Sequence, residues 1–423
     1  MKCWNRIGKY SMNHIFKLKN HIKQYDWGSP DWLPQLLGVD NKERKPWAEL
    51  WMGIHQEGPS EIEYEGAAIG LSELINQEPC RYLGSEIGSR FGTLPFLFKA
   101  LAAGKPLSIQ AHPSLVQAQA GWDRENQAGI PLKASNRNYK DPNHKPEILC
   151  ALRDFRAMSG FRECPEIVKR LEMLAEFGPD STQTALGSLS RILTSSDEQP
   201  QRLRMFFKAL FSLSSAVKRE LSVCVKTYQE ALVKAHPEYS REWETAAYFA
   251  ELYPGDPAAI APLYLNVIDL RPGQAIYIPA GILHAYISGF GVELMANSDN
   301  VLRGGLTSKH IDLEELLHIL DFTPFNPEIL NPQGTIYPTS CKEFTLSVMT
   351  GLNNNPLYCH TKAGPAIVLV TQGTLTIRYL NSSEVCVLKQ GESAFISALD
   401  AQEFYVFQGD CTLYAATVGD CAL

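Results

Sequence analysis

The sequence predicts a mainly β protein with a helical insertion, and three observations lead to this prediction. Short strand-like runs bounded by glycine and proline occur on both sides of the middle of the chain. Residues 160–250 instead show helical spacing of apolar residues. Two of the β segments also resemble each other. At roughly 100–200 residues per domain, a chain of 423 residues is expected to form about two or three domains.

The N-terminal part, residues 13–155, is rich in proline, glycine and aromatic residues and contains short strand-like runs. We expect it to form one β domain together with residues 255–325. Residues 156–254 are expected to form a helical domain, and residues 326–423 a smaller C-terminal β domain. The helical domain would thus be inserted into the first β domain.

The helical domain is predicted from three segments. The first ends before Gly178, a common type of helix stop, and its apolar residues at i, i+4, i+7 and i+10 are Ile167, Leu171, Leu174 and Phe177. Residues 202–235 are helical in pattern and almost free of glycine and proline. Residues 240–252 continue this character until Pro254 and Gly255 interrupt it.

The β character returns after this block. Residues 264–270 and 274–278 are strand candidates separated by a Pro-Gly turn. Near the C-terminus, residues 367–370, 373–377 and 394–396 form further short runs with turn signals between them. This spacing is typical of a β-sandwich or jelly roll.

An internal repeat relates residues 273–280 to residues 391–398, each with a glycine turn, a short apolar strand and a bend. This is a cupin-like pattern, and we therefore expect two cupin-type jelly-roll barrels, the C-terminal one smaller. At the same offset His284 corresponds to Gln402, so only the first barrel keeps an imidazole at this position.

Charge and cysteine content exclude several classes of protein. The net charge of −7, from 39 Lys and Arg against 46 Asp and Glu, argues against general nucleic-acid binding. No apolar run approaches the roughly 18 residues of a membrane span, and no apolar stretch of a signal peptide follows the basic N-terminus. Ten cysteines without a CxxC pair indicate reduced thiols. We expect a cytoplasmic protein that binds neither nucleic acid nor membrane.

Several common catalytic motifs are absent from the sequence. It contains no phosphate-binding P-loop, no complete dinucleotide fingerprint, no HExxH zinc-protease motif and no GxSxG nucleophile turn. The sequence therefore gives no sign of these four kinds of site.

Ser108, Gln110 and His112 form the first candidate pattern. Residues two apart in a strand point to the same face, so these three side chains would project together. A neutral imidazole is a good zinc ligand, and a glutamine carbonyl is a weaker oxygen donor. The alternative is a hydrogen-bonded structural histidine.

Residues 141–148 form the second pattern, in which polar residues between two prolines run directly into an apolar stretch. Pro142 and Pro146 fix the backbone and disfavour a helix. A rigid loop that enters a buried strand can bring Lys145 and Glu147 to the same face. The alternative is a solvated loop with a surface ion pair.

The third pattern extends from residue 277 to residue 310. His284 follows a Pro-Ala-Gly bend that could aim it into the mouth of a barrel. Arg303 precedes two glycines where backbone can approach a ligand closely, and Lys309 adds a second cation. Such a group suits a phosphate or sugar-phosphate anion, and the alternative is a surface turn with ordinary charges.

These patterns belong to a series of longer segments, and the sequence closely resembles the type I phosphomannose isomerases, also called mannose-6-phosphate isomerases. The segments are QYDWG (24–28), WAELWMG (47–53), LPFLFK (94–99), QAHPS (110–114), KPE (145–147), HAY (284–286) and NSDNVLRGGLT (297–307). The resemblance covers most of the chain. Residues 1–12 lie upstream of the usual start of the family, and Met12 is a candidate alternative initiator.

The resemblance implies one zinc ion per chain, with four ligands. These are Gln110, His112, Glu147 and His284. It also implies reversible conversion of mannose 6-phosphate to fructose 6-phosphate through a cis-enediol or enediolate, in which a base removes the C2 proton. The expected partner is therefore a sugar phosphate, and we expect the chain to act as a monomer.

Further roles follow from the same resemblance. We expect Arg303 to be the essential electrostatic residue, with Glu293 or Lys145 in proton transfer and His55 and Asp299 as other candidates for it. The candidates for contact with the substrate phosphate are Ser108, Lys99 and Lys309. The residues expected to line the pocket are Trp27, Glu49 and Tyr286.

Two other functions remain open at this stage. His112, Glu147 and His284 would also satisfy the two-histidine, one-carboxylate triad of an iron oxygenase. A non-catalytic sugar-binding cupin is the second alternative, and Gln402 is compatible with one barrel being only structural. Oxygen uptake would distinguish the first alternative, and turnover of mannose 6-phosphate with stoichiometric zinc would exclude the second.

Overall fold

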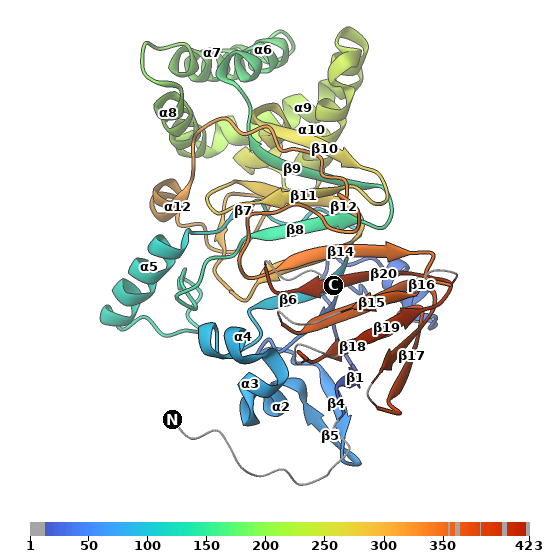
Figure 1. The fold of residues 1–423 in the computed structure, drawn as a ribbon. Coiled ribbons are helices and arrows are strands. Elements are labelled where there is room, and N and C mark those ends of the chain that lie inside the picture. Colours follow the sequence, from blue (N-terminus) through green and yellow to red (C-terminus); the bar gives the residue numbers. More distant parts are fainter. Residues whose placement is uncertain (1–12, 354–355, 360–363, 381, 400–403, 420–423) are drawn as a thin grey trace.

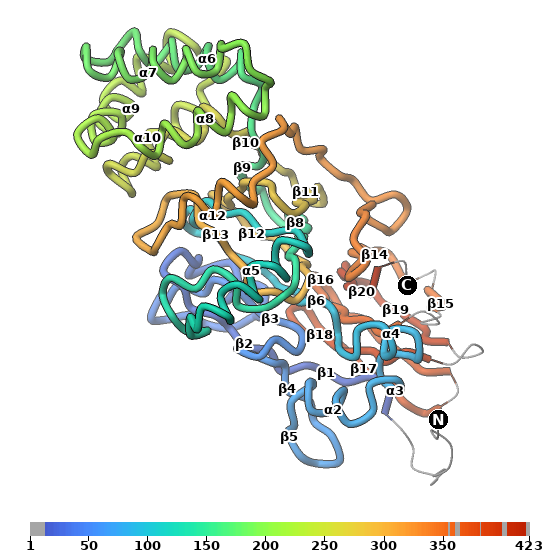
Figure 2. Tube along the Cα trace, turned by 90° about the vertical axis from the view of Figure 1, so that its left-hand side faces the viewer, coloured from blue at the N-terminus to red at the C-terminus, as the bar shows by residue number. Residues whose placement is uncertain are grey.

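The computed structural model describes residues 13–353, 356–359, 364–380, 382–399 and 404–419. It shows a mainly β structure with a group of helices at one end (Figure 1). Figures 1 and 2 both place these helices next to the larger of two sheets and far from the C-terminal strands. The predicted mainly β protein with helices is therefore confirmed. Met12 and Gln402, singled out above, lie outside the described residues.

The larger sheet contains ten antiparallel strands of the described chain, and β12 is the longest of them. The strands are β2 (His21–Lys23), β3 (Glu49–Met52), β6 (Phe96–Ala103), β7 (Gln110–Ala111), β8 (Glu147–Ala151), β9 (Phe155–Phe161), β10 (Leu265–Leu270), β11 (Ala275–Ile278), β12 (His284–Ala296) and β13 (Leu302–Arg303). The first part of β12 pairs with β7 and β9, and its last part with β6 and β8. All of its residues except Ser288 are buried. Strand β12 therefore has residues of four other strands beside it.

The smaller sheet has eight strands among the described residues, mostly from the C-terminal part of the chain. They are β1 (Ile15–Lys17), β14 (Thr345–Thr350), β15 (Leu357–Cys359), β16 (Ala366–Tyr379), β17 (Val385–Lys389), β18 (Ser393–Ile396), β19 (Tyr405–Gln408) and β20 (Cys411–Thr417). Strand β1 comes from the N-terminal region that we assigned to the first β domain, but it pairs with β18, where Ile15 lies opposite Ile396. The pairing gives β18 a second neighbour beside β16 and buries Ile15 and Phe16.

The strands predicted after residue 254 agree with the structure except at one place. Residues 367–370 and 373–377 are not two strands but parts of the single strand β16. Its register shifts between Val370 and Gln372, and Gly373 has φ +77°, so the glycine signal marks a bulge instead of a chain reversal. The repeated segments have the same local form, since Gly273 (φ +85°) precedes β11 as Gly391 (φ +83°) precedes β18.

The helical group follows β9 and returns to the larger sheet at β10. It consists of α6 (Cys164–Ala175), α7 (Asp180–Leu193), α8 (Gln199–Ser212), α9 (Ser215–Ala235), η1 (Pro237–Tyr239) and α10 (Ser240–Leu252). The helices begin later than residue 156, because residues 155–161 form β9 and pair with β10 and β12. Residues 202–235 are divided between α8 and α9, where Ser214 caps α9 by accepting a hydrogen bond from the Val217 N–H.

The other helices and one hairpin surround the two sheets. They are α1 (Trp32–Leu37), β4 (Glu61–Tyr64) with β5 (Ala67–Gly70), α2 (Leu71–Gln77), α3 (Pro79–Leu83), α4 (Ser85–Arg90), α5 (Leu115–Gln127), η2 (Pro257–Ile260), α11 (Ala261–Tyr264) and α12 (Leu313–Ile319). No helix of the described ranges is long and apolar enough to cross a membrane.

Two buried apolar clusters connect these parts. One joins the helical group to the larger sheet and includes Leu171, Trp243 and Tyr264. The other lies between the two sheets, where Phe98 and Phe395 belong to the same cluster. Burial of such large side chains is the main stabilising contribution and fixes the elements that carry the polar residues described next.

Candidate metal centre and adjoining cavity

Three buried side chains that are distant in sequence meet on the larger sheet: His112, Glu147 and His284. One follows β7, and the other two begin β8 and β12. One possible ligand atom from each lies within 4.8 Å of the others. The Nε2 atom of His112 is 3.5 Å from Glu147 Oε1, and that of His284 is 3.3 Å from Glu147 Oε2. The structure thus brings together three of the four residues expected to bind metal.

The Nδ1 atom of each imidazole forms a hydrogen bond with a backbone carbonyl group. His112 Nδ1 lies 2.7 Å from the carbonyl oxygen of Asn300, and His284 Nδ1 lies 2.9 Å from that of Ile282. A carbonyl only accepts hydrogen bonds, so each Nδ1 carries the hydrogen and each Nε2 keeps its lone pair. Both Nε2 atoms and Glu147 Oε2 are buried without a hydrogen-bond partner in the described chain. Such an arrangement suits a divalent cation.

Gln110, the fourth expected ligand, lies beside this group. In the sheet it is directly opposite His284 on β12 and opposite Arg303 on β13. Opposite residues of antiparallel strands point to the same face, so all three side chains share one face of the sheet. Gln110 also lines a cavity next to the three buried ligands. Its amide oxygen could therefore add a neutral donor to the two imidazoles and the carboxylate.

Lys145 lies next to the carboxylate of this group and affects the charge of its members. Its Nζ lies 2.9 Å from Glu147 Oε1, so the loop with two prolines does bring both side chains to one face. Burial by itself would raise the pKa of Glu147, but Lys145, His112 and His284 together outweigh burial and hold that pKa well below its usual value. Burial, together with Lys145, lowers the pKa of His112 to about 4. A carboxylate and a neutral imidazole are the forms that bind metal.

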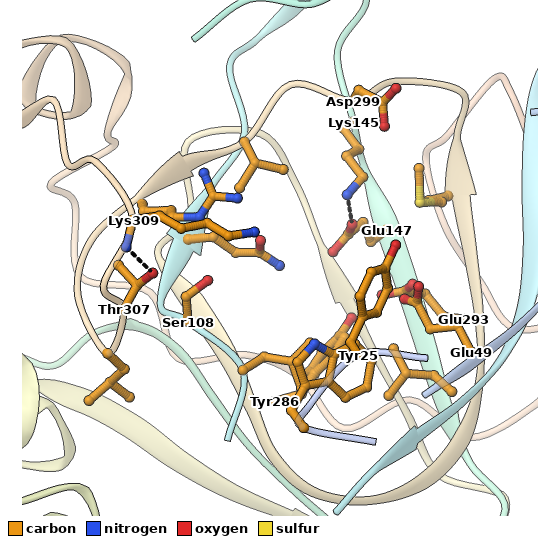
Figure 3. Close-up of a pocket in the computed structure, with 18 of the residues that line it drawn as sticks. Tyr25, Glu49, Ser108, Lys145, Glu147, Tyr286, Glu293, Asp299, Thr307 and Lys309 are labelled. Atoms are coloured by element: carbon orange, nitrogen blue, oxygen red, sulfur yellow. Dashed lines mark hydrogen bonds and ion pairs between the residues drawn. The ribbon is translucent and has the colours of Figure 1, made fainter. Parts of the chain in front are cut away.

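The adjoining cavity has a volume of about 720 Å³ and is lined by almost all of the expected site residues (Figure 3). Only His112 and His284 are not among its lining residues, because they are buried beside it. The expected residues that line it are Trp27, Glu49, His55, Lys99, Ser108, Gln110, Lys145, Glu147, Tyr286, Glu293, Asp299, Arg303 and Lys309.

Carboxylates gather at one end of this cavity, where Figure 3 shows Glu49, Glu147 and Glu293 close together. Lys99 Nζ lies 2.8 Å from Glu293 and 3.3 Å from Glu49. Burial alone would lower the pKa of Lys99, but the two carboxylates raise it above its usual value. Burial raises the pKa of Glu293, although Lys99 opposes this shift. Lys99 therefore lies at the carboxylate end. Figure 3 shows Glu49 and Glu293 away from Ser108 and Lys309.

His55 and Asp299 form a second polar pair on the cavity wall. His55 Nε2 lies 3.3 Å from Asp299 Oδ1. Burial would raise the pKa of Asp299, but His55 lowers it below its usual value. The backbone N–H of Asp299 also donates to Asp141 at 2.7 Å, which fixes the position of this loop.

Cationic and hydroxyl groups lie at the opposite end. Figure 3 shows Ser108, Thr307 and Lys309 together, on the far side of the cavity from Glu49 and Glu293. Burial lowers the pKa of Arg303 and, together with Arg303 itself, that of Lys309. A guanidinium remains charged at neutral pH even so. The cavity is thus electrically polarised along its length.

Sequence reasoning missed several residues of the cavity wall, among them Tyr25, Lys140 and Thr307. Tyr25 stacks on Trp27 with ring centroids 5.6 Å apart, and burial raises its pKa to about 12. Tyr25 and Thr307 lie inside segments that carry the resemblance, so their place in those segments was the available signal. Lys140 has no such signal, because a single lysine in a polar loop is ordinary.

Comparison with known proteins identifies the family of this chain. The model of the type I phosphomannose isomerase catalytic domain matches residues 15–164. The mannose-6-phosphate isomerase of Escherichia coli K12 is 38% identical over 389 residues, which are 90% of this chain and 94% of the relative. That of Bos taurus is 33% identical over 91% of this chain and 93% of its own.

Similar solved structures come from the same family. A mutant of phosphomannose isomerase from Salmonella typhimurium matches with a TM-score of 0.86 and 34% identity, over 96% of this chain and 100% of its own. A mannose 6-phosphate isomerase described as holo and zinc bound matches with a TM-score of 0.85 and 35% identity over the same shares. The chain therefore belongs to the type I phosphomannose isomerases, the family of mannose-6-phosphate isomerase enzymes.

Proposed function

We propose that this protein is a zinc-dependent aldose–ketose isomerase that interconverts mannose 6-phosphate and fructose 6-phosphate through a cis-enediol or enediolate. The observation that carries the proposal is the meeting of His112, Glu147 and His284 beside a cavity with a cationic far end. A sugar phosphate suits both ends of this cavity. Its hydroxyl groups could contact the metal ion, and its phosphate dianion could pair with the cationic side chains at the far end.

Zinc fits the residues present. Two imidazoles with unpartnered Nε2 atoms, a carboxylate and a side-chain amide form a donor set of the kind zinc binds in proteins. We propose that Gln110, His112, Glu147 and His284 hold the ion. The relative described as zinc bound supports zinc as the ion. When bound, zinc would act as a Lewis acid that stabilises negative charge on substrate oxygens.

The proposed orientation of the substrate follows from the two ends of the cavity. We place the phosphate at Ser108, Thr307 and Lys309, where hydroxyl and ammonium groups can donate hydrogen bonds to it. Lys99, which we expected at the phosphate, would instead balance the charges of Glu49 and Glu293. Trp27, Tyr286 and Tyr25 would then face the sugar ring.

Arg303 lies directly opposite Gln110 on the neighbouring strand and lines the cavity. We propose that its guanidinium stabilises the negative charge that develops on the substrate oxygens. Proton transfer between C2 and C1 is assigned to Glu293 or Lys145. The raised pKa of Glu293 favours it, because a carboxyl group that titrates nearer to neutral pH is a stronger base.

The domain organisation is also part of the proposal. We propose that residues 13–155 and 255–325 form the catalytic cupin domain, residues 156–254 the helical domain, and residues 326–423 a cupin-like β domain. Two strands modify these bounds, since β9 would belong to the catalytic domain and β1 to the C-terminal one. The separate apolar cluster inside the smaller sheet and the matching glycine turns at Gly273 and Gly391 support two related jelly-roll barrels.

A coupled isomerase assay with mannose 6-phosphate tests the proposal. We expect turnover by the purified protein, its loss after chelation with a measured loss of bound metal, and its recovery when zinc is added back. The metal-free protein with magnesium is the matched control and is expected to stay inactive. Unchanged turnover by protein shown to be free of metal would contradict the proposed role of zinc.

A further inference from the structure

Asp256 lies outside the cavity wall but is bonded to a turn that forms part of it. It follows α10, in the connection between the helical group and η2. One carboxylate oxygen accepts a hydrogen bond from the backbone N–H of Ala258 at 2.9 Å. The other accepts from the backbone N–H of Leu306 at 2.8 Å. A single side chain therefore joins the end of the helical group to residues 304–307.

This turn has an unusual backbone conformation. Leu306 has φ +53°, a region that bulky side chains rarely adopt, and the adjacent Gly305 has φ +125°. A Cβ atom on Gly305 would lie 2.2 Å from the Cβ of Ala258, so the turn packs tightly against the segment that Asp256 begins. A backbone in such a conformation persists only where its surroundings hold it.

The opposite side of the turn is tied to the strand with the expected phosphate and metal contacts. The Gly304 N–H donates to the Ile109 carbonyl at 2.7 Å, and the Ile109 N–H donates to the Gly305 carbonyl at 3.0 Å. Ile109 lies between Ser108 and Gln110 in the sequence. The turn is therefore held between this segment on one side and Asp256 on the other.

The side chains around this turn line the cationic end of the cavity. Arg303 precedes it, Thr307 ends it, and Lys309 follows. We infer that Asp256 is a positioning residue that sets the affinity of this end for a phosphate group by fixing the backbone of residues 304–307. The inference rests on the proposed function, because it takes the anion at this end to be the phosphate of the substrate.

The test compares wild-type protein with Asp256→Asn, whose amide is the same size but can accept through one oxygen only. The measured quantities are the Kd of inorganic phosphate by calorimetry, KM and kcat for mannose 6-phosphate, zinc content and Tm. We expect the phosphate Kd and KM to rise together by about tenfold, with zinc content unchanged and kcat changed much less. Asp180→Asn, at an exposed position on α7, is the matched control and should match wild type.

A second variant, Asp256→Glu, keeps the charge but moves the carboxylate by one methylene. It should give a smaller rise in both constants. A lower Tm with unchanged KM and phosphate Kd would overturn the inference, as would failure of both variants to fold. Phosphate binding is measured without turnover, so a wild-type protein that binds phosphate but does not isomerise would refute the proposed function alone.

Discussion

His112 Nδ1 lies 2.7 Å from the backbone carbonyl oxygen of Asn300, and this contact determines which ring nitrogen faces Glu147. Asn300 is fully buried and is itself held by its side chain. Its amide nitrogen donates to the backbone oxygens of Asp141 and Asn143 at 2.7 and 2.9 Å. The orientation of His112 thus depends on the loop that contains Asp141 and Asn143, and this loop leads to Glu147.

Asn300→Ala removes these side-chain hydrogen bonds while keeping the carbonyl that contacts His112. We expect zinc affinity to fall by about 10- to 100-fold, as for other losses of support behind a metal-binding histidine. Competition with a chromophoric chelator measures this affinity directly. Asn331→Ala, at an exposed position, should leave it unchanged. Equal zinc affinity of Asn300→Ala and wild type would show that the histidine needs no such support.

His284→Ala removes one of the three buried ligand atoms, the Nε2 atom that lies 3.3 Å from Glu147 Oε2. We expect bound zinc and isomerase activity to be lost together, because the remaining side chains supply too few donors. Metal analysis and the coupled assay on the same sample check this. His318→Ala, on an exposed face of α12, is the control and should retain both. A His284→Ala variant with full zinc content would remove His284 from the ligand set.

Much of this site could be predicted from the sequence, because its residues lie in short segments with recognisable spacing. Gln110 and His112 are two apart, and Lys145 and Glu147 follow fixed prolines, so local geometry already constrains each pair. The electrical polarity of the cavity could not be predicted in this way. It depends on Lys99 meeting Glu293 and Glu49 across three strands, with partners 194 and 50 positions away.

In the fold, too, the individual strands could be predicted from local sequence, but the pairing of distant segments could not. The strands at 274–278 and 394–396 follow from local pattern, and the structure confirms them as β11 and β18. The pairing of β1 with β18 depends on contacts between the two ends of the chain, so no local pattern could reveal it. The contact of Asp256 with Leu306 joins residues 50 positions apart and has no sequence signature either.

Arg303→Ala should separate electrostatic stabilisation from metal binding. We expect zinc content to remain at the wild-type level, since the guanidinium is not among the expected ligands. We expect kcat to fall by about 10²- to 10³-fold, the usual effect of removing a donor to a developing negative charge. Steady-state kinetics with parallel metal analysis measures both quantities. Arg271→Ala, in an exposed turn, is the control, and a normal kcat in Arg303→Ala would exclude Arg303 from the reaction.

Lys99→Met leaves Glu49 and Glu293 buried without their shared cation. We expect the free energy of unfolding to fall by about 3–5 kcal/mol at neutral pH, the usual effect of breaking a buried ion pair. The loss should be smaller near pH 5, because burial raises the pKa of Glu293 and its unpaired carboxyl group can then take up a proton. Denaturation with urea at both pH values measures this. Lys19→Met removes an exposed partner of Glu61 and should change stability by no more than about 1 kcal/mol. Similar losses in both variants would show that the buried pairs contribute little.

Glu343 gives a pH-dependent link between the two sheets, because its carboxylate lies 3.0 Å from His144, just before Lys145. Burial would raise the pKa of Glu343, but hydrogen bonds from His144 and Cys341 lower it to about 2.

A carboxyl group with a lowered pKa stabilises the fold above its unfolded pKa of about 4.3, and this contribution disappears as the pH falls through about 2. We therefore expect Glu343→Gln to reduce the free energy of unfolding by on the order of 2 kcal/mol at pH 6. The difference from wild type should shrink steadily between about pH 4.3 and 2. Urea denaturation of both proteins across this range checks the trend, with Glu328→Gln, at an exposed position, as the control. A difference that stays constant with pH would mean that the charge of Glu343 contributes nothing to the fold.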